Sequence, residues 1–129
     1  MDTMSVNATA DRPTPSLAGA RKSTRRFLEG LHRPIGAKDA DSILLVVSEL
    51  VTNALRHGGG TCTLDLYAHP DSIEVAVHDH SRQAPHLRTP DLTGATGGFG
   101  WRMVNHLARA TAVTRPAEGG KTVSALLPR

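Results

Sequence analysis

The chain has 129 residues and one cysteine, Cys62, so it can form one compact domain but neither an intrachain disulfide nor a zinc site built from cysteines. Its apolar runs are far shorter than a bilayer span, which predicts a cytoplasmic protein with no membrane segment. The net charge of +3 fits a phosphate ligand or an acidic protein partner, whereas an aromatic content of 3% leaves little for stacking nucleic-acid bases, so direct nucleic-acid binding is disfavoured.

The beginning of the chain differs in composition from the rest. Residues 1–15 are polar and contain Pro13 and Pro15, which predicts a flexible leader. The remaining residues, 16–129, are expected to form a single domain, because no internal repeat is visible and the length suits one core.

Two amphipathic helices are predicted in the first half of the domain. Residues 16–32 repeat apolar side chains near a 3.6-residue period, and their basic residues lie mainly on the other faces. A second helix is predicted from about Lys38 to Gly58, with Asp39 and Asp41 near its positive end.

From residue 61 the apolar period changes to two, which is typical of strands. Residues 61–67 and 73–78 alternate apolar and polar side chains, and the short link 69–72 predicts an antiparallel hairpin. Residues 80–98 show neither period and contain prolines and glycines, which predicts a long functional loop, here a mobile lid.

A third helix is predicted over about 99–108, followed by strands over 110–115 and 122–127. Strands adjacent in sequence pair most readily with each other, and the helices have an apolar face to bury. The sequence therefore predicts an α+β two-layer sandwich, with about three helices on one face of a mainly antiparallel sheet.

The second predicted helix carries a candidate catalytic pair, Glu49 and Asn53. Residues at i and i+4 lie on the same helix face, so the carboxylate and the amide can converge on one ligand. Their oxygens suit Mg²⁺, and the carboxylate can also accept a proton. The alternative is an ordinary solvated helix face.

Two further segments indicate a nucleotide site. Gly97, Gly98 and Gly100 lie where the lid meets the third helix, so backbone N–H groups there can face a phosphate; the alternative is a flexible hinge. Asp79 ends a predicted strand just before the lid, and its carboxylate can accept a hydrogen bond from a base amine, with support from Ser81. An Asp that only starts a turn is the alternative.

Two competing motifs are disfavoured. Gly120-Lys121-Thr122 resembles the end of a Walker phosphate loop, but Arg115 stands where that motif needs a glycine, and a strand pattern follows. A metal site at His78, Asp79 and His80 is disfavoured because alternation along a strand places Asp79 on the face opposite the two histidines.

In this order the motifs resemble the GHKL superfamily of histidine kinase-like ATPases, over about residues 15–127. The likeness is greatest to small bacterial anti-sigma-factor serine/threonine kinases and their actinobacterial relatives, and it implies a Bergerat-type ATP-binding fold. The family's N box is resembled by Ser48–Gly58 and its first glycine box by His78–Ser81. Its second glycine box is resembled by Gly97–Val104 and its closing strand by Gly120–Val123.

The resemblance implies roles for individual residues. Glu49 is implied as the general base, Asn53 as a Mg²⁺ ligand, and Asp79 as the residue that recognises the adenine amino group. Ser81 and Gln83 stand where the family usually has glycines. The other residues implied in ATP binding are His57, Ser81, Gly97, Gly98, Phe99, Gly100, Trp101, Arg102 and Thr122.

The function implied is that of an ATP- and Mg²⁺-binding serine/threonine protein kinase that phosphorylates an anti-anti-sigma partner and sequesters a sigma factor. The resemblance also suggests a homodimer. The alternative is a catalytically inactive module in which bound nucleotide sets the affinity for a protein partner. Retention of Glu49 favours the kinase, whereas the altered first glycine box favours the inactive module.

Overall fold

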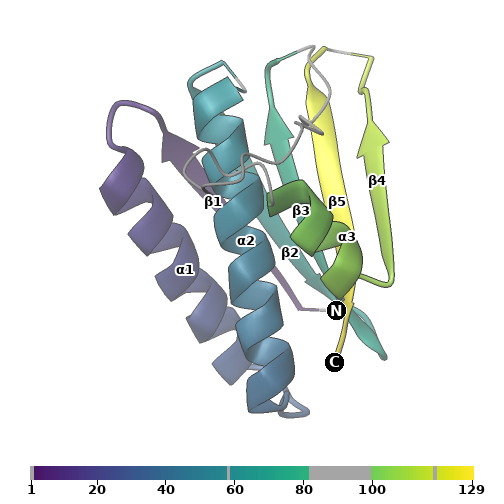
Figure 1. Ribbon diagram of the computed structural model, residues 1–129. Helices are drawn as coiled ribbons and strands as arrows, with labels where there is room; N and C mark the ends of the chain where they lie inside the picture. Colours follow the sequence, from purple (N-terminus) through teal and green to yellow (C-terminus); the bar gives the residue numbers. More distant parts are fainter. Residues whose placement is uncertain (1, 58, 82–99, 118) are drawn as a thin grey trace.

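The computed structural model describes residues 2–57, 59–81, 100–117 and 119–129. Within these residues, three helices cover one face of a five-stranded sheet, as Figure 1 shows. This architecture confirms the predicted α+β two-layer sandwich. In chain order the elements are β1 (Thr3–Thr9), α1 (Pro13–Glu29), α2 (Ala37–His57), β2 (Thr61–Ala68), β3 (Ser72–Asp79), α3 (Gly100–Leu107), β4 (Ala110–Thr114) and β5 (Lys121–Pro128).

The sheet is antiparallel throughout its described strands, in the order β1-β2-β3-β5-β4. The predicted hairpin is formed by β2 and β3, while β5 lies between β3 and β4. This insertion brings the end of β3 beside the start of β5, where Asp79 pairs with Lys121 and His78 pairs with Thr122. Two segments far apart in sequence therefore meet at one end of the sheet.

Side-chain alternation along the strands builds the core. Every second residue of β2 and β5 is buried against the helices, and burial of each large aliphatic side chain stabilises the fold by roughly 1.5–3 kcal/mol. The most deeply buried of these side chains include Ile43, Val47, Val51, Leu64, Leu66, Ile73, Val75, Val77, Val104 and Leu127.

Strand β1 corrects the expectation of a flexible leader over residues 1–15. It pairs with β2 along its whole length, and Met4, Val6 and Ala8 lie opposite inward-facing residues of β2. Ala8 is buried, and Met4 packs against the core. These apolar residues form only a short alternation among polar neighbours, so the sequence pattern did not reveal the strand.

Helix α1 begins at Pro13 rather than at residue 16 and ends at Glu29 rather than at residue 32. Proline is tolerated in the first turn of a helix because the amide hydrogen it lacks has no partner there, so Pro13 and Pro15 start the helix instead of preceding it. The lid predicted for residues 80–98 falls almost entirely on residues 82–99, which lie outside the described residues.

Helix α2 is the centre of the helical layer. It contacts α1, α3 and four of the five described strands. No helix in the described part of the chain is long and apolar enough to cross a bilayer. The buried stripe of α2 consists of Ile43, Leu44, Val46, Val47, Leu50, Val51, Ala54 and Leu55.

Candidate functional site

Glu49 and Asn53 lie one helical turn apart on α2, next to its buried stripe. Both side chains are half-buried, so they stand at the boundary between the core and the surface. The i, i+4 spacing puts the carboxylate and the amide on one face of the helix, as the sequence predicted.

The first residue of α3, Gly100, lies directly against the Glu49 side chain. A Cβ atom added to Gly100 would overlap the carboxylate, with the Glu49 Cδ atom only 2.8 Å away. Trp101 and Val104 are buried and hold α3 on the core. Glycine is therefore the residue that lets the carboxylate approach the N-terminal end of α3, where backbone N–H groups and the helix dipole favour negative charge.

Burial raises the pKa of the Glu49 carboxyl group above its ordinary value of 4.5, and the positive charge of Arg56 opposes this shift without cancelling it. A carboxylate with a raised pKa holds a proton more firmly once it has accepted one. General bases are most effective when their pKa lies closer to the working pH. Glu49 is thus suited to accept a proton.

The same shift predicts a dependence of stability on pH. Because the folded protein binds the Glu49 proton more tightly than the unfolded chain does, ionised Glu49 lowers the free energy of unfolding above pH 4.5, and this penalty disappears as the pH falls below that value. Glu49→Gln is therefore expected to be more stable than the wild type at pH 7, but not at pH 4. Urea unfolding at both pH values measures the difference in stability between Glu49→Gln and the wild type. Glu29→Gln, at an exposed position of α1, is the control. An equal stability difference at pH 7 and pH 4 contradicts the prediction.

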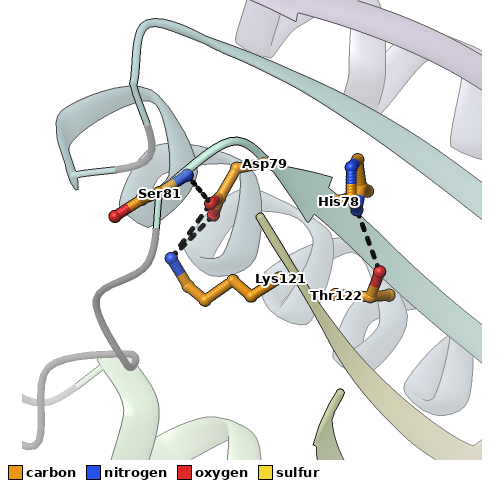
Figure 2. A network of polar contacts seen from close by, with 5 residues as sticks. All are labelled: His78, Asp79, Ser81, Lys121 and Thr122. Atoms are coloured by element: carbon orange, nitrogen blue, oxygen red, sulfur yellow. Dashed lines mark hydrogen bonds and ion pairs between the residues drawn. The ribbon is translucent and has the colours of Figure 1, made fainter. Parts of the chain in front are cut away.

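The second part of the site lies at the end of β3, where Asp79 is buried at 2% exposure. Its Oδ1 atom accepts a hydrogen bond from the Ser81 backbone N–H at 2.8 Å. Lys121, only 4% exposed, lies with its Nζ atom 2.9 Å from Oδ2 and 3.1 Å from Oδ1. Figure 2 shows the lysine of β5 pointing at this carboxylate from the neighbouring strand.

Gly120 fixes the approach of β5 to Asp79. Its φ of +77° lies in the left-handed region, and a Cβ atom there would overlap the Asp79 carbonyl oxygen.

Burial raises the pKa of the Cys62 thiol to about 11, with the negative charge of Asp79 as the second cause. Cys62, which pairs with Asp79 across β2 and β3, therefore stays protonated at neutral pH and is no nucleophile.

Thr122 lies on the opposite face of the sheet from Asp79. Its hydroxyl oxygen is 3.0 Å from the Nδ1 atom of His78, and Figure 2 shows this pair apart from the Asp79 contacts. The registers of β3 and β5 cause this, because His78 and Thr122 are opposite each other one position away from Asp79 and Lys121. The structure therefore does not bring Thr122 together with Asp79.

The other residues predicted to bind the cofactor are placed as follows. Trp101 is buried in the core, Arg102 is exposed on α3, and His57 is half-buried at the last position of α2. Gly97, Gly98 and Phe99 lie outside the described residues.

Sequence reasoning gave Lys121 no role, although the residue lies in the rejected Walker motif and in the segment that resembles the family's closing strand. A signal was present, since position 121 is in the same alternation phase as the apolar residues of β5. A lysine at an inward-facing strand position needs a buried partner of opposite charge. Asp79, the one acidic residue at the end of the preceding hairpin, is that partner.

Among the described residues, no group of three or more His, Cys, Asp or Glu side chains is arranged to hold a metal ion. The family model described as "Histidine kinase-like ATPase domain" matches residues 9–126 of the chain. No protein of curated function matches the chain.

Proposed function

The chain belongs to the histidine kinase-like ATPase family, which implies ATP binding, and we propose that it is a cytoplasmic, Mg²⁺-dependent serine/threonine protein kinase that regulates a partner protein. The finer proposal is that it phosphorylates an anti-anti-sigma-like protein and sequesters a sigma factor. Support for this comes from the order of the four motifs, which resembles that of anti-sigma-factor kinases.

One observation carries the proposal: the half-buried Glu49 carboxylate, with a raised pKa, lies against the first residue of α3 and one turn from Asn53. Partial burial of a carboxylate has a cost in free energy, and carboxylates whose pKa is raised in this way cluster at functional sites. The position of Glu49 against Gly100, the last of the three glycines predicted to face a phosphate, supports the role of a base near the transferred phosphate.

The oxygen atoms of Glu49 and Asn53 fit a Mg²⁺ nucleotide, because Mg²⁺ prefers one or two carboxylate or amide oxygens together with substrate phosphates. When bound, ATP·Mg²⁺ supplies the phosphoryl group that passes to a serine or threonine oxygen, leaving ADP. Asn53 would hold the metal ion, and Glu49 would take the proton that the hydroxyl group loses. Phosphoryl transfer depends mainly on such positioning and on charge.

Replacing Asn53 by alanine tests the site. Loss of a metal ligand is expected to weaken Mg²⁺-dependent ATP binding by more than the roughly 10- to 100-fold that loss of an outer-shell partner costs. Isothermal titration with ATP, with and without Mg²⁺, measures this. Asn7→Ala is the control, because Asn7 lies on edge strand β1, where it accepts a hydrogen bond from Thr63. Retained affinity in Asn53→Ala contradicts the placement of the metal.

A protein partner is supported by the charge of α1. Lys22, Arg25 and Arg26 are exposed on this helix, and only Glu29 on the same helix is acidic. Such a basic surface favours association with an acidic protein surface. Nucleic acid would be attracted to the same charge. The aromatic content of this chain is only 3%, however, so nucleic-acid bases would find few aromatic side chains on which to stack.

A second candidate is a catalytically inactive module in which bound nucleotide changes the affinity for a protein partner. The buried contact of Lys121 with Asp79 favours this candidate, because it engages the carboxylate that is expected to recognise the base. The two candidates differ in whether the γ-phosphoryl group is transferred, so the role of Glu49 separates them.

A further inference from the structure

The contact between Asp79 and Lys121 bears directly on which base the site can recognise. A carboxylate offers about four acceptor positions. At Asp79, the Ser81 N–H and the Lys121 ammonium both contact Oδ1, and the ammonium also contacts Oδ2. Only 2% of Asp79 is exposed, so the protein itself surrounds what remains of the carboxylate.

We infer that Lys121 determines base selectivity, because it occupies the acceptor positions of Asp79 that an exocyclic base amine requires. This inference rests on the proposed ATP site and adds to it a residue that no motif assigns. The site then binds a nucleoside triphosphate through its phosphates and gains little from the amine of adenine.

The relative strength of the two donors supports this. The ammonium of Lys121 and the carboxylate of Asp79 carry opposite charges, whereas the amine of adenine is neutral and gains no ion-pair attraction from Asp79. To reach Asp79, the amine has to displace Lys121 and leave a buried ammonium without its partner, which is costly.

The backbone keeps Lys121 in place. Asp79 and Lys121 are directly opposite each other in the register of β3 and β5. Gly120 packs against the main chain of Asp79 and His80. A Cβ atom added to Gly120 would lie 3.2 Å from the Asp79 carbonyl carbon and 3.2 Å from the His80 Cα atom. The lysine stem therefore enters the site from a strand that cannot shift without breaking these contacts.

Comparison of ATP with ITP tests the inference, because ITP carries a carbonyl oxygen in place of the exocyclic amine. Wild-type protein is expected to bind ATP and ITP within about threefold of each other, since a blocked amine adds less than one net hydrogen bond. In Lys121→Thr, Asp79 is released, and ATP affinity is expected to rise at least about tenfold, as for a hydrogen bond to a charged group. ITP affinity stays unchanged. Isothermal titration in Mg²⁺ gives all four values.

Two further variants assign the gain to Asp79. In Lys121→Thr combined with Asp79→Ala, the preference for ATP should return to within about threefold. Lys38→Thr, which removes an exposed lysine near the start of α2, should leave the wild-type ratio unchanged. If the gain persists without Asp79, the inference is overturned.

The wild-type ratio decides the question even if Lys121→Thr does not fold. A wild-type preference for ATP of more than about tenfold shows that the amine reaches its acceptor with Lys121 present and overturns the inference alone. Equal gains for both nucleotides in Lys121→Thr also overturn it alone. If neither wild-type nor variant protein binds any nucleotide, the proposed function fails, and this inference fails with it.

Discussion

Replacing Glu49 by glutamine is expected to slow phosphoryl transfer by about 10²- to 10⁴-fold, the range typical of a lost general base. Glutamine keeps the size of the side chain and its packing against Gly100, but it cannot accept the proton of the attacking hydroxyl group. ADP formed from ATP under single-turnover conditions, with water or the captured partner as acceptor, measures the rate.

ATP affinity separates a catalytic role from a binding role of Glu49. If Glu49 acts on the proton, affinity measured by titration should change less than about tenfold while the rate falls. Glu74→Gln is the matched control, because Glu74 is also half-buried but lies on β3, where it pairs with His69 at 2.9 Å. If wild type and Glu49→Gln form ADP equally slowly, with and without the partner, the kinase is excluded and the inactive module is favoured.

The layers of the fold could be predicted from the sequence because its helices and strands bury long, regular apolar stripes. The stripe of α2 and the alternation of β2 are each long enough to specify element type and orientation. Strand β1 escaped prediction because its inward residues include only one fully buried side chain, that of Ala8. Formation of this strand depends on pairing with β2 and on contact with α1, and neither is encoded in the local sequence pattern.

The candidate site was predictable where it depends on spacing along one element and not where it depends on strand register. Glu49 and Asn53 share a face because the helical repeat dictates it. The position of Lys121 beside Asp79 depends on β5 pairing with β3 rather than only with β4, and on which residues are opposite. The same register placed Thr122 on the other face, and a shift by one residue would exchange the two.

Replacing Lys121 by methionine is expected to lower the free energy of unfolding by about 3–5 kcal/mol, the cost of removing one partner from a buried ion pair. Methionine keeps most of the volume of the lysine stem and fits an apolar environment, so packing changes little. What remains is the Asp79 carboxylate, 2% exposed and deprived of the ammonium 2.9 Å from its Oδ2 atom. Urea unfolding at pH 7 measures the loss.

A variant that lacks both charges shows whether the loss comes from the unpaired charge of Asp79. Asp79→Asn combined with Lys121→Met removes both charges, and the pair is expected to be more stable than Lys121→Met alone, because a neutral amide costs less to bury than a carboxylate. Lys22→Met, at an exposed position of α1, should stay within about 0.5 kcal/mol of the wild type. If Lys121→Met is as stable as that control, the ammonium does not compensate the buried charge of Asp79. The stability of this end of the sheet and the base selectivity of the site are both expected to depend on this one ion pair, so the stability measurement also tests the premise of the selectivity inference.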